Sequence, residues 1–220
     1  MNRDAHQQET IERAKQFVQT ELAGAEGGHD WWHVYRVWKT ARKIAASEDV
    51  DPLVVELAAL LHDIADPKFH GGDEETGPRK AEAFLKSRDV DNDTTEHIVN
   101  IIKNMSFKNS LGRVEFHSKE MEVVQDADRL DAIGAIGIAR AFNYGGYKNR
   151  PLYDPGIKPN MKMSKEEYKK GNSPTINHFY EKLLLLRDKM NTETGRKLAE
   201  ERHEFMENFL RRFYLEWEGE

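Results

Sequence analysis

The sequence contains no cysteine among its 220 residues. Disulfide bonds, iron–sulfur clusters and a cysteine nucleophile are therefore excluded. Long apolar stretches are missing as well, since the longest, LVVELAALL and AIGAIGIA, are under the roughly 18 residues of a membrane span. The polar N-terminal segment also lacks the apolar core of a signal peptide. We therefore predict a cytoplasmic protein that does not associate with membranes.

An excess of positive charge is also lacking. The chain has 33 Lys and Arg against 39 Asp and Glu, a formal net charge of -6. Polyanion binding would need a local basic patch, so no long nucleic acid is expected as a partner. The hydrophobic fraction of 38% and charged fraction of 33% indicate a folded protein with many charged helix faces. The length predicts a single domain over residues 1–220.

Strand-like alternation of apolar and polar residues is absent too, and apolar residues instead recur every three or four positions. This spacing predicts an all-α fold. The stretch 145–172 separates the last two helices from the rest and contains three prolines and four glycines, which predicts a long irregular loop, often a lid or a disordered segment. The expected helices span residues 11–22, 34–45, 53–61, 80–85, 95–102, 123–142, 175–190 and 192–217.

Four side chains interrupt these apolar patterns and could bind a metal ion: His33, His62, Asp63 and Asp128. An ionisable group buried without a partner is costly, so four such groups suggest one shared site. His62 and Asp63 follow the apolar run LAALL, which predicts the C-terminal end of a helix. Nitrogen and oxygen donors together suit Mn, Fe, Ni, Co or Mg better than the thiolate-rich sites of structural zinc.

Other interpretations of these residues stay open. A single buried histidine is more often a hydrogen-bonded core residue than a metal ligand. We expect Asp126, Asp128 and Asp131 to begin a very apolar helix, where Asp126 could be the N-cap. Asp128 and Asp131 would share one face of that helix, with Asp126 about 200° away from Asp128.

Three segments carry a family resemblance: HDWWHVYRVWKTA, LLHDIADPKF and QDADRLDAIGAIGIARAF. They resemble motifs of the HD superfamily of metal-dependent phosphohydrolases, in which an early His, a His-Asp doublet and a distant Asp bind the metal. The segments SPTINHFYEKLLLL and EERHEFMENFLRRFYLEW resemble bacterial stand-alone HD proteins that include a nucleoside triphosphate pyrophosphohydrolase. The Ala-Asp-Arg-Leu core favours Asp128 over Asp126 as the ligand. The resemblance implies an HD-domain helical bundle and one divalent ion held by His33, His62, Asp63 and Asp128.

Candidates for the remaining chemistry lie near these motifs. Asp66, where some HD nucleotidases carry Glu, could position the attacking water, and Lys68 could hold a phosphate. Core packing is expected for Trp31 and Phe107. The further candidates for substrate binding are the cations Arg36, Lys108 and Arg129 and the loop tyrosines Tyr144 and Tyr147. Taken alone, each cation is more often an ordinary surface or ion-pair charge.

These residues predict a hydrolase of a small phosphorylated substrate, most specifically of a nucleoside triphosphate to the monophosphate and pyrophosphate. A nucleoside 5'-monophosphate phosphatase is the alternative enzyme. A catalytically silent metal or nucleotide sensor is the alternative outside enzymes. A homodimer is a possible assembly.

Overall fold

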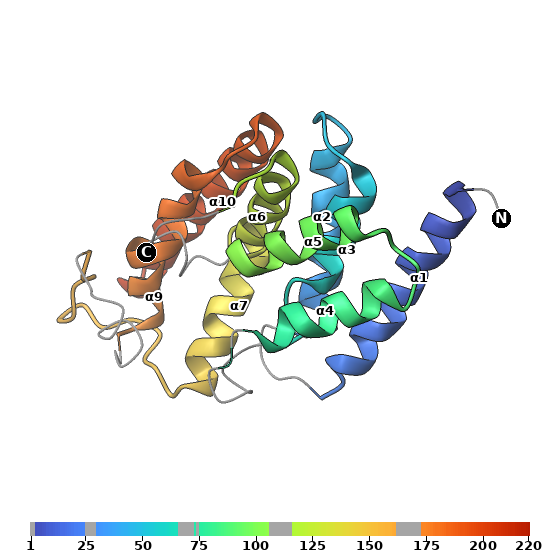
Figure 1. The fold of residues 1–220 in the computed structure, drawn as a ribbon. Helices are drawn as coiled ribbons and strands as arrows, with labels where there is room; N and C mark the ends of the chain where they lie inside the picture. The colour runs from blue at the N-terminus through green and yellow to red at the C-terminus, as the bar shows by residue number, and fades with distance from the viewer. Residues whose placement is uncertain (1–2, 25–29, 66–72, 74, 106–115, 162–172) are drawn as a thin grey trace. The chain divides into compact units, whose positions relative to one another are not determined.

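The computed structural model describes residues 3–24, 30–65, 73, 75–105, 116–161 and 173–220. Helices are the regular elements throughout these ranges, which contain no strand (Figure 1). The all-α prediction is therefore confirmed. None of the described helices is both long and apolar enough to cross a membrane. The α-helices are α1 (Arg3–Glu21), α2 (Trp31–Ala45), α3 (Pro52–Leu61), α4 (Thr76–Lys86), α5 (Asn92–Asn104), α6 (Lys119–Asp131), α7 (Gly134–Tyr147), α9 (Thr175–His178) and α10 (Glu193–Trp217).

The chain divides into two compact units, Met1–Asp128 (unit 1) and Arg129–Glu220 (unit 2). The division falls inside α6, near its C-terminal end. The assignment of the whole chain to one domain stays a prediction.

Helix α3 forms the centre of unit 1 and contacts α1, α2 and α5. Its start lies one residue before the predicted position 53. The Asp51 side chain caps the helix by accepting a 2.8 Å hydrogen bond from the Leu53 amide, with Pro52 in the first turn. A helix that is apolar nearly all round belongs in a core. Its buried residues are Val54, Val55, Leu57, Ala58, Ala59, Leu60 and Leu61.

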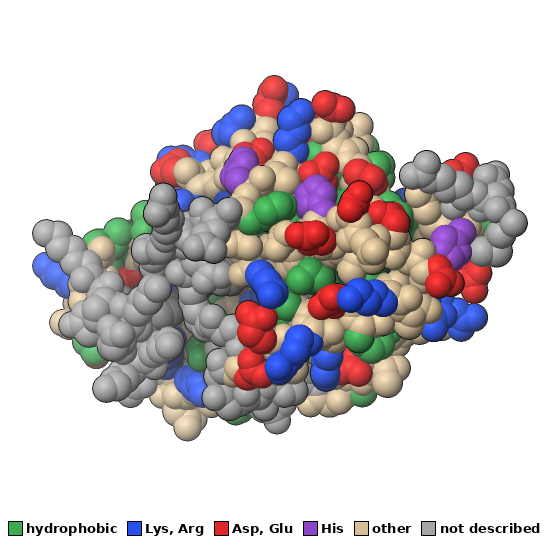
Figure 2. Space-filling model, viewed as in Figure 1, with side chains coloured by type: hydrophobic (Ala, Val, Ile, Leu, Met, Phe, Trp, Pro, Cys, Tyr) green, Lys and Arg blue, Asp and Glu red, His purple; other side chains and the backbone are tan. Residues whose placement is uncertain are grey.

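The outer surface of α4 and α5 carries charges of both signs. Acidic and basic side chains are interspersed over these two helices in Figure 2. Several are paired: Lys86 Nζ lies 2.6 Å from Glu82 Oε1, and Lys103 Nζ lies 3.0 Å from Glu75 Oε2. A mixed surface of this kind favours solubility without attracting ligands of one sign.

Unit 2 is organised around α10, which packs against α7. The Thr192 hydroxyl caps α10 by accepting a 2.9 Å hydrogen bond from the Gly195 amide. The core of this unit is aromatic: the ring centroid of Phe209 lies 5.8 Å from that of Phe179 and 5.9 Å from that of Phe142. These separations are typical of favourable aromatic pairs.

Two predicted helices are interrupted in the structure. The helix expected over 123–142 ends at Asp131 and resumes at Gly134, whose φ of +73° lies in the left-handed region that glycine adopts without strain. A β-carbon on Gly134 would lie 2.9 Å from Arg202 Cγ, so the position also lacks room for a side chain. Apolar spacing alone does not reveal such a break, because the pattern continues on both sides.

The prediction of one continuous helix over 175–190 is also wrong. The segment consists of the short α9, a π-helical turn (Phe179–Leu183) and a 3-10 helix (Leu184–Lys189). These forms differ by one residue in hydrogen-bond spacing, which a run as apolar as LLLL does not distinguish. Of the predicted 145–172 loop, the first residues extend α7 to Tyr147, residues 148–161 contain no helix, and residues 162–172 lie outside the described ranges.

Candidate metal centre

Helix α2 positions His33 in its first turn. The Asp30 side chain caps the helix by accepting a 2.9 Å hydrogen bond from the His33 amide. The His33 residue is only 2% exposed. The cap therefore fixes the start of α2 at the point where the imidazole enters the interior of unit 1.

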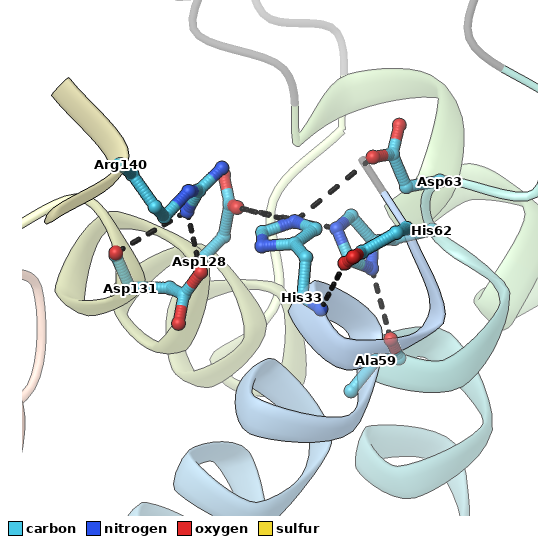
Figure 3. A network of polar contacts seen from close by, with 8 residues as sticks. His33, Ala59, His62, Asp63, Asp128, Asp131 and Arg140 are labelled. Carbon is cyan, nitrogen blue, oxygen red and sulfur yellow. Dashed lines mark hydrogen bonds and ion pairs between the residues drawn. The ribbon is translucent and has the colours of Figure 1, made fainter. Parts of the chain in front are cut away.

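The end of α3 positions the second imidazole. His62 is the C-cap residue, and its Nδ1 lies 2.8 Å from the carbonyl oxygen of Ala59, as predicted for a residue at the helix end (Figure 3). Because a carbonyl oxygen only accepts, Nδ1 carries the proton in this hydrogen bond. The Nε2 atom of His62 is then left with a lone pair, the state a metal ligand requires.

Donor atoms from three elements converge on His33 in Figure 3. The Nε2 atom of His33 lies 3.4 Å from Asp128 Oδ1, and that oxygen lies 4.0 Å from His62 Nε2. One ligand atom each from His33, His62 and Asp128 lie within 4.8 Å of one another. The Asp63 carboxylate lies near the same histidine, with Oδ2 3.9 Å from His33 Nε2. Two imidazoles and two carboxylates from distant parts of the chain are thus brought together.

Helix α6 supplies Asp128 from its second half. The helix begins at Lys119, so the expectation that Asp126, Asp128 and Asp131 begin a helix is wrong, and so is the N-cap interpretation of Asp126. The preceding residues 106–115 lie outside the described ranges. Asp126 is fully buried, whereas the Asp128 side chain is 43% exposed and lies against the imidazoles. Asp128 therefore has both the position and the access that a ligand needs.

Two arginines of unit 2 hold the C-terminal end of α6. Arg140 pairs with the Asp131 carboxylate and donates a 3.2 Å hydrogen bond to the Asp131 carbonyl oxygen (Figure 3). Arg202 donates to the carbonyl oxygen of Leu130. Burial lowers the pKa of the Arg202 guanidinium, and the nearby Asp131 opposes that shift. Cations at the last carbonyls of a helix satisfy groups without intrahelical partners.

Sequence reasoning missed both arginines. Arg140 lies 9 residues from Asp131, and Arg202 lies 72 residues from Leu130. The sequence signal that could have pointed to them was Asp131, a carboxylate within the helix predicted over 123–142. In the structure Asp131 is only 4% exposed and therefore needs a partner.

The other predicted site residues are distributed more widely. Asp66, Lys68 and Lys108 lie outside the described residues, as does Phe107. Arg36 is partly buried on α2, and Trp31, expected in the core, is partly buried too. Arg129 donates a 2.5 Å hydrogen bond to the carbonyl oxygen of Lys189 at the end of the 3-10 helix.

Tyr144 and Tyr147 lie at the C-terminal end of α7 in unit 2 and are 45% and 66% exposed. Lys148 Nζ lies 4.9 Å from the ring centroid of Tyr147, and the Arg150 guanidinium carbon lies 5.5 Å from that of Tyr144. These are cation–π distances. The two tyrosines are thus exposed and lie in contact with positive charge.

Comparison with known proteins agrees with this fold and cluster. Residues 31–133 match the model of the HD domain. The chain is 40% identical over 204 residues to YpgQ of Bacillus subtilis (strain 168), which covers 91% of this chain and 90% of YpgQ. The chain belongs to the HD-domain superfamily, so the resemblance inferred from its motifs is confirmed.

Solved structures give the same result. An HD-superfamily hydrolase from Bacillus thuringiensis matches with a TM-score of 0.78 and 42% identity, over 97% of this chain and 100% of that one. The structure of Bacillus subtilis YpgQ in complex with ADP matches with a TM-score of 0.74 and 35% identity, over 94% of this chain and 95% of that one. The chain has the fold of an HD-superfamily hydrolase.

Proposed function

We propose that the protein hydrolyses a nucleoside triphosphate to the monophosphate and pyrophosphate, using one divalent ion held by His33, His62, Asp63 and Asp128. The observation that carries this proposal is the convergence of the Asp128 carboxylate on the Nε2 atoms of both histidines. The ligands come from α2, the end of α3 and α6, so only the folded chain assembles them.

The donor set fits a divalent ion. The hydrogen bond from His62 Nδ1 to the Ala59 carbonyl leaves Nε2 as the coordinating atom. The two carboxylates of Asp63 and Asp128 would offset the charge of a doubly positive ion. Mixed nitrogen and oxygen ligands suit Mn, Fe, Ni, Co or Mg.

Hydrolysis needs more than ligands. A divalent ion, when bound, lowers the pKa of a coordinated water and polarises a phosphoryl oxygen. Asp66, three residues after Asp63, is proposed to orient the attacking water and accept its proton, and Lys68 to bind a phosphate. Arg36, Lys108 and Arg129 are the further cations proposed for the phosphate chain.

A nucleotide is the proposed substrate for two reasons. The related YpgQ has been crystallised in complex with ADP. In this chain, Tyr144 and Tyr147 present exposed aromatic faces next to Lys148 and Arg150, a combination that suits a base and a charged phosphate.

The test is a nucleotide screen of metal-reconstituted protein with separate detection of pyrophosphate and orthophosphate. Pyrophosphate release from nucleoside triphosphates that disappears in His62→Ala supports the proposal. The matched control is His117→Ala, because the His117 side chain is 68% exposed, and this variant should retain full turnover.

Other outcomes of the screen identify the alternatives. Orthophosphate released from nucleoside 5'-monophosphates would point to the phosphatase. Protein that binds metal and nucleotides without turning over any of them would point to the sensor.

A further inference from the structure

The outward face of α2 carries a stripe of exposed aromatic and basic side chains, which we call the α2 stripe: Trp32, Tyr35, Lys39 and Lys43. Spacings of three, four and four residues place these side chains within an arc of about 80°. Trp32 is 60% exposed and Tyr35 is 36% exposed. The opposite face of the helix is buried and carries Val34, Val37, Ala41 and Ile44.

The rings of the stripe continue into a basic cluster. The ring centroid of Tyr35 lies 6.0 Å from that of Trp32 and 5.9 Å from that of Trp38. Trp38 is covered by cations: Lys15 Nζ lies 4.0 Å from its ring centroid and the Arg42 guanidinium carbon 5.0 Å. Aromatic surface at one end of the stripe thus meets positive charge at the other.

Helix stability does not account for the two lysines of the stripe. Lys39 and Lys43 are four residues apart, a spacing at which like charges destabilise a helix. Arg42 and Lys43 lie in the last turn, where the helix dipole favours cations, but Lys39 lies before it. Lys39 Nζ lies 5.8 Å from the Trp38 ring centroid, near the outer limit of a cation–π contact, so the helix offsets little of this repulsion.

The pairing of charges also differs from that on the rest of unit 1. Arg42 lies 3.4 Å from Glu56 Oε2, and Lys15 lies 2.6 Å from Glu12 Oε1. Within the described part of the chain, Lys39 and Lys43 are in no ion pair. On α4 and α5, in contrast, lysines such as Lys86 are paired with acids. The stripe therefore presents uncompensated positive charge in a chain with a net charge of -6.

We propose that the α2 stripe binds a short single-stranded nucleic acid, with bases stacked on Trp32 and Tyr35 and backbone phosphates contacting Lys39 and Lys43. Every base has a π-face, so stacking on exposed rings beside basic groups is the usual arrangement for binding single strands. The stripe runs from Trp32 to Lys43, about 17 Å along the helix axis, which suits a segment of about three or four nucleotides.

An acidic peptide would match the lysines but would leave Trp32 and Tyr35 without a function. A nucleic acid uses both ends of the stripe. The negative net charge argues against general attraction to polyanions, and this stripe is the local basic patch that such binding requires. The proposal goes beyond the proposed hydrolysis and does not depend on it.

The test is the fluorescence anisotropy of a labelled single-stranded oligo(dT), measured over a series of salt concentrations that begins low. EDTA is present so that metal-dependent turnover plays no part. The double variant Lys39→Glu, Lys43→Glu should bind at least tenfold more weakly. The slope of log affinity against log salt should fall by about 1.4, since each lost phosphate contact on a single strand contributes about 0.7. Trp32→Ala should weaken binding roughly tenfold.

The matched control is Lys86→Glu, Lys103→Glu, which makes the same change in net charge on α4 and α5 and should bind like the parent. Circular dichroism should show that both double variants are folded. The proposal is overturned if the parent does not bind oligo(dT), or if both double variants lose affinity equally. It is also overturned if polyglutamate binds better than oligo(dT), or if Trp32→Ala binds like the parent.

Discussion

The surroundings of two histidines, the buried His33 of unit 1 and the half-buried His178 of unit 2, are opposite in charge. His33 of unit 1 lies 3.4 Å from an oxygen of Asp128 and 3.9 Å from one of Asp63. His178 of unit 2 lies near two cations instead: burial, Lys182 and Arg150 together lower its pKa to about 3. An imidazole among carboxylates suits a metal cation, whereas cations beside an imidazole keep it neutral and themselves repel a metal ion.

The cores of the two units also differ, one being aliphatic and the other aromatic. Unit 1 packs an aliphatic helix, α3, whose end delivers polar ligands, while unit 2 packs aromatic rings along α10. We therefore expect substitutions in unit 1 to change metal binding and substitutions in unit 2 to change stability.

The largest expected effect is on metal affinity in unit 1. Asp128→Asn should weaken binding of Mn²⁺ more than 100-fold, beyond the roughly 10–100-fold typical of groups that only support a ligand. Asp126→Asn should leave the affinity close to that of the parent, although Asp126 is fully buried. Isothermal titration calorimetry on metal-free protein measures both. Loss of metal in Asp126→Asn alone would mean that the ligand of α6 is misassigned.

The candidate metal ligands were more predictable from the sequence than the arginines that contact the end of α6. His33, His62, Asp63 and Asp128 are each recognisable because a polar group interrupts an apolar helical pattern, and the structure brings these four side chains together. Each signal is local, lying within a few residues of the ligand. Arg140 and Arg202 contact α6 from later segments, and nothing in a helical period encodes such contacts.

The fold shows the same division between local and distant causes. The starts of the helices capped by Asp51 and Thr192 could be predicted to within one residue, because a cap acts within three residues of the sequence. The break before Gly134 depends on the Arg202 side chain and on a positive φ, neither of which changes the apolar spacing. The π-helical turn after α9 likewise leaves the pattern of apolar residues unchanged.

The next largest effect is expected in the aromatic core of unit 2. Phe179 is fully buried, so Phe179→Ala should lower the free energy of unfolding by about 3–5 kcal/mol through lost burial and a residual cavity. Phe205→Ala is the control, because Phe205 is 52% exposed and its truncation should cost much less. Urea denaturation measures both. A strong loss of metal affinity in folded Phe179→Ala would contradict the separation of roles.

A smaller loss is expected from the pair that holds the end of α6. Arg140→Ala removes the partner of a carboxylate that is only 4% exposed and should cost about 2–3 kcal/mol, as for a hydrogen bond to a charged group. Adding Asp131→Asn to Arg140→Ala should recover part of the loss, because the buried side chain that has lost its closest cation is then neutral. Arg211→Ala is the control, since Arg211 donates only an exposed hydrogen bond to Asn208. Equal losses for Arg140→Ala and Arg211→Ala would mean that the buried pair is not stabilising.

The smallest expected effect is a dependence of stability on pH that originates at His178. Its pKa is about 3 in the folded chain against an ordinary value of 6.5, so between these values the unfolded chain binds a proton that the folded chain does not. The free energy of unfolding should therefore be unaffected by this group above pH 6.5 and fall by about 1.4 kcal/mol per pH unit below it. Measurements between pH 6.5 and 5 avoid most carboxylate titration. His178→Gln should flatten this slope, whereas His117→Ala, at an exposed position, should keep it. An unchanged slope in His178→Gln would show that His178 accepts a proton in the folded state, and the contrast with His33 would then fail.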